Sequence, residues 1–295
     1  MTESKWNRNY IILPDPKLPD LTRSVKGLSH DGQHEEIKVI EEKPLTIFLN
    51  STEIVTVMTI GDYPEYLALG FLFNQGMLNS YQSVQRIDYD RELQTVVVRT
   101  TEKTNYEEKL QKKVRTSGCA VGTVFGDQME LIEGLKLPFL KVKTSWLYHL
   151  AKSINLTPSL YLEAGAIHGT VLCKEDKTLV YMEDVGRHNA VDKINGWMKS
   201  NNIRPNDKIL YTTGRLTSEM ILKTALMGIP VLVSRSGFTA WGVEIATKVN
   251  LTLVGRMRGK RFICLSGEER LERNVSPAEI KEEARRHQRK GAQND

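Results

Sequence analysis

The sequence predicts a layered α/β domain preceded by a smaller α+β part, and two observations support this fold class. From about residue 145, strand-like and helix-like segments alternate, which is typical of helices that cover the faces of a mixed sheet. From Pro44 to residue 140, strand-like pairs instead lie on either side of a helical segment. A chain of 295 residues is long enough for one large domain or two unequal ones.

These patterns divide the chain into four expected parts. Residues 1–43 combine prolines and charges with few periodic apolar positions, which predicts a loosely ordered arm. Residues 44–140 form the N-terminal α+β part, which ends in the loop that carries Cys119. Residues 141–267 form the α/β domain, and residues 268–295 form a charged tail, either an exposed helix or a disordered segment.

In the N-terminal part, polar turns separate the strand-like runs. Residues 44–50 and 53–60 alternate aliphatic and β-branched residues around a polar turn, which predicts a hairpin. The elements expected after it are a helix within 63–78, strands at 84–90 and 93–100, a Gly/Ser/Thr-rich loop at 115–127 and a helix-like segment at 128–135.

In the α/β domain, apolar runs alternate with amphipathic ones. The expected elements are a helix near 145–155, strands near 167–173 and 178–184, a helix at 188–200, a strand at 208–214, a helix at 217–228, a strand at 230–237, a helix at 239–249, and strands at 251–257 and 261–266.

The helix at 188–200 illustrates the reasoning. Its apolar side chains form one stripe that should pack on the sheet: Ala190, Val191, Ile194, Trp197 and Met198. Asp192, Lys193 and Lys199 lie off this stripe. The free backbone N–H groups of the first turn, with Arg187 and His188 beside them, should favour an anion.

Charge and cysteine content exclude several classes of protein. The formal net charge of +5 is mild, and it fits either attraction to phosphates or ordinary solvated Lys and Arg, so we expect no nucleic-acid partner. Apolar stretches are interrupted by charges such as Glu219, and no signal-peptide-like run begins the chain, so we expect no membrane association. Three widely spaced cysteines favour a reducing compartment, the cytoplasm, over a secreted disulfide framework.

Cys119 is the candidate nucleophile. It lies in the small-residue loop, with Lys112, Lys113 and Arg115 just upstream. Positive charges and free N–H groups favour the thiolate, which can attack a sulfur atom bound to another thiol and hold it as a persulfide. The alternative is a small buried side chain, which is the role we expect for the other two cysteines.

A second cluster lies in residues 183–193, with the sequence EDVGRHNAVDK. Two carboxylates end a strand, and Arg187, His188 and Asp192 follow at a helix start. Polar groups at such a strand end commonly bind ligands in α/β sheets, so Asp184, Arg187 and His188 are candidate contacts. The alternative is a helix cap with surface ion pairs.

A third cluster surrounds Gly259. Arg256, Arg258, Lys260 and Arg261 could converge with turn N–H groups on phosphates, or could form a solvated basic strand edge.

Two further segments, at other strand ends, could line one crevice with this basic cluster, and His168 is a separate candidate. Arg215 closes a Thr-Gly-Arg segment, and residues 234–236 follow another strand. His168 is a candidate acid, base or cofactor contact, or else a structural histidine. The His-x-Glu and Pro-Cys-x-x-Cys patterns of zinc deaminases are absent, so we expect no metal site.

Together these segments resemble the FdhD family of formate dehydrogenase accessory proteins, over about residues 44–265. The most specific match is EDVGRHNAVDK. The others are SGC at 117–119, TGR at 213–215, SEM at 218–220, GIPVLVSRS at 228–236 and LTLVG at 251–255.

The resemblance implies a sulfurtransferase with a persulfide intermediate on Cys119. It implies that a cysteine desulfurase donates the sulfur, and that the acceptor is the molybdenum bis(molybdopterin guanine dinucleotide) cofactor, bound as a substrate before it enters formate dehydrogenase. It implies a homodimer with a cytidine-deaminase-like fold, no zinc chemistry and no tightly held cofactor of its own. The family's cofactor-binding stretch corresponds here to Arg256, Met257, Arg258, Gly259, Lys260 and Arg261.

Two departures from the family pattern leave rival functions open. Gly122 replaces the second cysteine of the usual Cys-x-x-Cys, and residues 164–166 read Ala-Gly-Ala rather than Thr-Gly-Gly. The first rival is a chaperone that binds the molybdenum cofactor without transferring sulfur. The second is a nucleotide-modifying enzyme of the deaminase type, which would need bound zinc.

Overall fold

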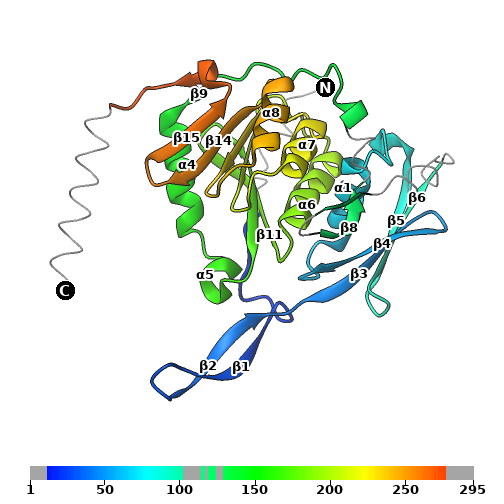
Figure 1. Ribbon diagram of the computed structural model, residues 1–295. Helices are drawn as coiled ribbons and strands as arrows, with labels where there is room; N and C mark the ends of the chain where they lie inside the picture. Colours follow the sequence, from blue (N-terminus) through cyan, green and yellow to red (C-terminus); the bar gives the residue numbers. More distant parts are fainter. Residues whose placement is uncertain (1–11, 102–113, 117–118, 124–128, 277–295) are drawn as a thin grey trace, which may run out of the picture.

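A six-stranded mixed sheet lies at the centre of the molecule (Figure 1). The computed structural model describes residues 12–101, 114–116, 119–123 and 129–276. The strand order is β11-β10-β12-β13-β14-β15, with β12, β13 and β14 parallel and the outer pairs antiparallel. The bounds are β10 His168–Lys174, β11 Lys177–Asp184, β12 Ile209–Thr212, β13 Val231–Ser234, β14 Thr252–Arg258 and β15 Arg261–Ser266.

Helices cover both faces of this sheet because its central strands carry apolar side chains on both sides. Leu210 belongs to the core under α6, α7 and α8, whereas its neighbours Ile209 and Tyr211 belong to the core under α4. The bounds are α4 Thr144–Leu156, α6 Arg187–Ser200, α7 Ser218–Leu226 and α8 Ala240–Lys248. None of the helices in the described part of the chain is both long and apolar enough to cross a bilayer.

A second sheet, with order β4-β3-β6-β5, lies to one side of α1 (Figure 1). Its strands are β3 Lys43–Leu49, β4 Thr52–Thr59, β5 Val84–Asp90 and β6 Thr95–Thr100, and α1 spans Pro64–Asn74. Leu67 and Leu72 of α1 share a core with Leu45 and Ile47 of β3.

The opposite side of α1 packs closely on α6. A Cβ atom on Gly196 would lie 1.9 Å from the Tyr66 carbonyl oxygen, and one on Gly70 would lie 1.7 Å from the Asp192 carbonyl oxygen. Both positions therefore require glycine, and α1 joins the two sheets as a shared layer.

The mixed α/β class predicted from the sequence is confirmed, and the expected strands and helices of both sheets are present. The domain boundaries stay a prediction. The remaining elements in the described residues are η2 Tyr81–Ser83, α5 Leu160–Ala164, η3 Glu268–Arg270, and a small sheet of β9 Val142–Lys143 with β16 Leu271–Glu272. The expected tail lies outside the described residues from 277 onward.

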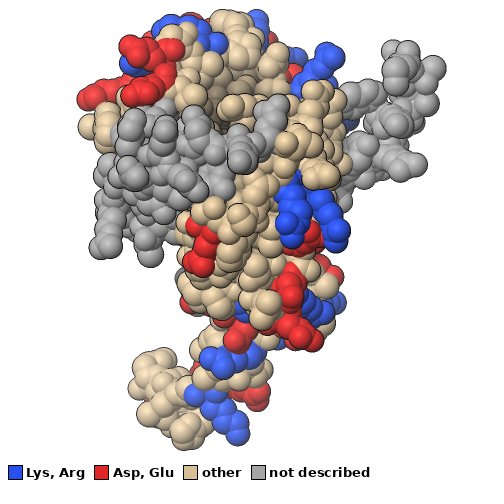
Figure 2. Space-filling view, turned by 90° about the vertical axis from the view of Figure 1, so that its right-hand side faces the viewer, with Lys and Arg blue, Asp and Glu red and all other residues tan. Residues whose placement is uncertain are grey.

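The predicted arm contains more regular structure than expected. β1 (Thr22–Leu28) and β2 (His34–Ile40) form an antiparallel hairpin, whose base packs with Leu160 and Ile167. The hairpin projects from the body of the molecule (Figure 1). On the side of the molecule shown in Figure 2, acidic and basic side chains intermingle. Most hairpin side chains are exposed, so the sequence lacks the alternation that marks a half-buried strand.

The prediction of a loop at 115–127 is wrong for the residues described there. β7 (Val114–Thr116) and β8 (Cys119–Thr123) pair antiparallel, with Thr116 opposite Cys119. Valine and threonine favour strands, and this preference prevails over the neighbouring glycines.

Candidate functional site

The polar side chains singled out in the sequence gather at one edge of the main sheet. β12 and β13 end together, with Thr212 opposite Ser234. β10 begins at this edge, because His168 pairs with Asp184 at the end of β11. α6, α7 and α8 follow β11, β12 and β13 and therefore start here as well. In α/β sheets ligands bind at such an edge.

A pocket of about 700 Å³ opens at this edge. Its ionisable lining side chains include His168, Arg235 and Arg258. The other lining residues are Tyr161, Gly165, Ala166, Ile167, Val185, Thr213 and Ser236. Two guanidinium groups beside hydroxyls and an imidazole suit the oxygens of a phosphate.

Arg235 and Tyr161 form one wall of the pocket. The Arg235 guanidinium lies over the Tyr161 ring, 5.5 Å from its centroid. Tyr161 is itself fixed, because the Glu183 carboxylate accepts hydrogen bonds from the N–H groups of Leu160 (2.8 Å) and Tyr161 (3.1 Å). Sequence reasoning grouped residues 234–236 with the crevice but gave no signal for Tyr161, which lies on a helix of only five residues.

His168 faces the pocket as a half-buried side chain. Its Nδ1 atom lies 3.4 Å from Thr213 Oγ1. Burial lowers the pKa of His168, the charges of Arg187 and Arg215 lower it further, and Asp184 opposes them. A neutral imidazole can both donate and accept a hydrogen bond.

His188 lies behind His168, at the start of α6. It is buried, with Nε2 3.3 Å from Glu219 Oε2. Burial holds the pKa of His188 well below its usual range, and the charges of Lys223 and Arg187 act in the same direction.

Arg187 depends on the glycine of the Thr-Gly-Arg segment. A Cβ atom on Gly214 would lie 2.9 Å from the Arg187 Cβ atom, so Gly214 makes room for this side chain. The structure thus brings the predicted contacts into one cluster, namely His168, Asp184, Arg187, His188 and Arg215.

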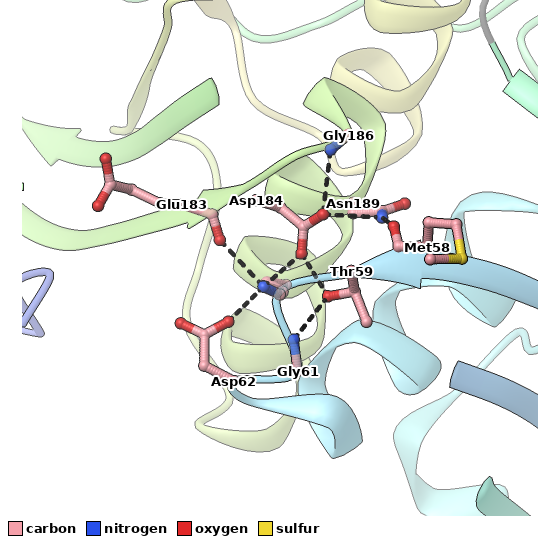
Figure 3. Close-up of polar contacts among 9 residues, drawn as sticks. Met58, Thr59, Gly61, Asp62, Glu183, Asp184, Gly186 and Asn189 are labelled. Atoms are coloured by element: carbon pink, nitrogen blue, oxygen red, sulfur yellow. Dashed lines mark hydrogen bonds and ion pairs between the residues drawn. The ribbon is translucent and has the colours of Figure 1, made fainter. Parts of the chain in front are cut away.

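The Asp184 carboxylate is the centre of a buried network (Figure 3). Its Oδ1 atom accepts hydrogen bonds from the Gly186 N–H (3.0 Å) and the Asn189 side chain (2.9 Å). Its Oδ2 atom accepts one from the Thr59 hydroxyl and pairs with Lys193 Nζ at 2.6 Å. Asp184 is a predicted cofactor contact, but these four donors come from the protein itself and join β4, β11 and α6.

Asp192 and Lys193, two of the three charges off the apolar stripe of α6, are buried because α1 packs on α6, whereas Lys199 is only partly buried. Lys193 is fully buried and also pairs with Asp62. Asp192 is buried with Lys223, at 2.6 and 2.7 Å, and accepts a hydrogen bond from Asn74 at 2.6 Å. The alternative of surface ion pairs is therefore wrong for this cluster, and sequence reasoning missed the roles of Lys193 and Asp62.

The basic segment around Gly259 is mostly exposed. A β-bulge interrupts the pairing between Gly255 and Arg258, and the Arg256 N–H donates a hydrogen bond to the Ser236 carbonyl at 2.8 Å. Bulges re-aim side chains, and here Arg258 reaches the pocket.

The other members of this segment are not among the residues that line the pocket. Arg256 and Arg261 are exposed, and Lys260 is partly exposed. The Met257 side chain is fully buried in the core under α4, so a ligand could reach this residue only at its backbone. Cofactor binding by these residues stays a prediction.

The side chain of Cys119 lies outside the described residues, although its backbone begins β8. β8 lies alongside β4. Cys173 is fully buried and Cys264 is partly buried, as expected for strand residues, and burial raises the pKa of both thiols. Among the described residues, no group of three or more His, Cys, Asp or Glu side chains could hold a metal ion.

Over most of its length the chain is similar to proteins described as sulfur carriers and to a solved formate dehydrogenase accessory protein. It is 29% identical over 238 residues to the sulfur carrier protein FdhD of Bacillus subtilis, covering 80% of this chain and 91% of that protein. It is 30% identical over 243 residues to the protein of the same name from Listeria monocytogenes serotype 4b, covering 81% and 93%. A crystal structure described as a formate dehydrogenase accessory protein from Desulfotalea psychrophila matches with a TM-score of 0.69 at 27% identity, covering 85% of this chain and 98% of that one.

The family of the chain is shown by a match to a sequence model of a whole protein family. The FdhD/NarQ family pattern matches residues 40–272, which include the pocket and the buried network. The chain belongs to the FdhD/NarQ family.

Proposed function

We propose that this protein is a sulfur carrier that passes sulfur from a cysteine desulfurase to the molybdenum bis(molybdopterin guanine dinucleotide) cofactor of a formate dehydrogenase. The Cys119 thiolate attacks the terminal sulfur of the desulfurase persulfide, the desulfurase cysteine leaves as a thiolate, and Cys119 becomes the persulfide. The cofactor in its reduced form then supplies the electron pair that bonds the outer sulfur, which becomes sulfide as the cofactor loses two electrons. The S–S bond breaks, and Cys119 leaves as the thiolate.

The observation that carries this proposal is the pocket at the sheet edge. It places His168, Arg235 and Arg258 around a space of about 700 Å³, which suits an anionic ligand larger than a simple phosphate. The names of the relatives, sulfur carrier and formate dehydrogenase accessory protein, supply the transferred group and the client.

The same reasoning gives the partners and the setting. The desulfurase donates sulfur, formate dehydrogenase is the client, and the cofactor is cargo rather than a resident group. We further propose a homodimer in the cytoplasm, with a main sheet layered as in the cytidine deaminases. The part of the chain that the structure describes has the alternating strand and helix order that such a layering requires.

The test is mass spectrometry of the protein after incubation with a cysteine desulfurase and cysteine. We expect the peptide containing Cys119 to gain one sulfur atom, and Cys119→Ala to abolish both this gain and activation of the client dehydrogenase. Cys264→Ala is the matched control and should keep both. Unchanged client activity in Cys119→Ala would reject sulfur transfer.

One sequence feature favours the rival chaperone function. Gly122 stands where the family has a second cysteine, so a second thiol cannot take part in a relay at that position. The chaperone hypothesis predicts that Cys119→Ala stays active, whereas Arg258→Glu or Arg261→Glu does not. The two hypotheses therefore differ in the outcome of one substitution.

A further inference from the structure

Two hydrogen-bonded side chains join β4, the strand beside β8 and its Cys119, to the end of β11 and the start of α6. Asn189 is buried, and its Nδ2 atom donates to the Met58 carbonyl (2.7 Å) and to Asp184 Oδ1 (2.9 Å). From the other side, the Thr59 hydroxyl donates to Asp184 Oδ2. Met58 and Thr59 form the end of β4, and Figure 3 shows Thr59 and Asn189 converging on Asp184 from different elements.

This junction connects the strand beside Cys119 to the residues that line the pocket. On one side, β8 with Cys119 lies alongside β4. On the other side, Asp184 pairs with His168 across β10 and β11 and directly precedes Val185, and both His168 and Val185 line the pocket. The Gly186 N–H bond to Asp184 then fixes the turn into α6.

We propose that Asn189 is a positioning residue for sulfur delivery: it holds the β4 end, and with it β8 and its Cys119, at a fixed place relative to the pocket. This inference rests on the proposed function. Asn189 touches neither sulfur nor cofactor in this role.

The step that depends on Asn189 follows from this geometry. Loading brings the desulfurase to Cys119 and needs only that cysteine. Ligand binding needs only the pocket, to whose lining Asn189 does not belong. Delivery needs both at a set separation, and a displacement of about 1 Å can slow an oriented reaction roughly 100-fold.

The side chain of Asn189 is suited to such a test because it is uncharged. Asn189→Ala removes two hydrogen bonds but leaves Asp184 with its bonds to Thr59, Gly186 and Lys193. Thr59→Val is a second, independent variant of nearly the same shape. It removes the bond to Asp184 from the β4 side, together with the bond that Thr59 Oγ1 accepts from the Gly61 N–H. Asn201→Ala is the matched control, because Asn201 Nδ2 bonds to the Trp197 carbonyl within the far end of the same helix.

The experiment compares the full-length wild-type protein and these three variants in four measurements. They are persulfide formation on Cys119, binding of guanosine diphosphate, activation of formate dehydrogenase, and hydrogen exchange of backbone amides. For Asn189→Ala and Thr59→Val we expect loading and nucleotide binding within about 2-fold of wild type and delivery reduced roughly 10- to 100-fold. Amides of β4 should exchange faster while those of β12 and β13 stay protected. Asn201→Ala should match wild type throughout.

Each outcome decides between positioning and a merely structural role. Delivery at the wild-type rate in both variants overturns the inference. A parallel fall of loading, binding and delivery in Thr59→Val also overturns it, since misfolding would cause such a fall. If wild-type Cys119 takes up no sulfur, the proposed function fails. The structural part of the inference, that Asn189 holds the end of β4 in place, is still tested by the hydrogen exchange of β4, and unchanged exchange overturns it.

Discussion

The two charged segments at the edge of the main sheet, 183–193 and 256–261, differ in where their charges go. In the first, Asp184, Asp192 and Lys193 are buried and satisfy one another or neighbouring elements. In the second, Arg258 and Arg261 stay exposed, and Arg258 lines the pocket. The first segment therefore fixes how β4, α1 and α6 fit together, and the second remains available to an anionic ligand.

The difference also shows how the protein compensates for the hydration that a charge loses when it is buried. A buried ion costs several kcal/mol in lost hydration, which is recovered only when partners surround it well. Lys193 meets this condition, because Asp62, Asp184 and the Glu183 carbonyl surround its Nζ atom. The exposed arginines keep their hydration in the folded protein, so a ligand can later replace this water.

The largest expected effect comes from removing the buried cation. Lys193→Met leaves the carboxylates of Asp62 and Asp184 without their shared partner, and breaking a buried pair in this way typically costs about 3–5 kcal/mol. We expect the free energy of unfolding, measured in urea, to fall by this amount. Arg261→Met, on the exposed segment, is the control and should change it by less than about 0.5 kcal/mol. Similar values for both variants would show that burial does not separate the two segments.

Two glycines, one in α6 just after the first segment and one within the second segment, provide a smaller contrast. Gly196 has the Tyr66 carbonyl oxygen 1.9 Å from where a Cβ atom would lie, whereas Gly259 has nothing within 4 Å. Gly196→Ala must push α1 and α6 apart, and we expect a loss of about 1–3 kcal/mol or more. Gly259→Ala meets only the strain of its positive φ of 58°, worth about 1–2 kcal/mol. Thermal denaturation of both variants shows which loses more stability. A greater loss for Gly259→Ala than for Gly196→Ala would contradict the expectation.

The sequence predicts the strands and helices well because their apolar periodicity is local information. It also predicts that residues 213–215 and 234–236 lie close together, because they follow the ends of neighbouring strands, whereas the place of His168 beside Arg187 and Arg215 follows only from the fold. It does not predict that Lys193 is buried. A lysine off the apolar stripe normally faces water, and only the packing of α1 on Gly196 covers that side.

The residues of the pocket, too, could be predicted only in part from the sequence. Arg258 could be named from the basic segment, but Tyr161 could not, because its place depends on Glu183, more than twenty residues away. Met257 lies within the predicted cofactor-binding stretch, yet its side chain is buried in the core. A continuous stretch of sequence cannot show which side of a bulged strand faces the ligand.

The smallest expected effect is a pH dependence that belongs to the buried segment alone. The pKa of His188 in the folded protein lies well below 6.5, because burial and the charges of Lys223 and Arg187 outweigh the nearby Glu219. The unfolded chain therefore binds a proton at this residue before the folded protein does. The contribution of His188 to stability is fully present above pH 6.5 and is lost as the pH falls from there toward the folded pKa.

His188→Gln removes this linkage. Buried carboxyls with a raised pKa, such as Asp62 and Asp192, act in the opposite direction, but they remain in both proteins and cancel in the difference. We expect the free energy of unfolding of wild type to fall more steeply than that of His188→Gln between pH 6.5 and about pH 5. Arg258→Gln, on the exposed segment, should keep the wild-type slope. Identical slopes for wild type and His188→Gln would mean that water reaches His188. The buried part of the first segment would then include Asp184 but not the start of α6.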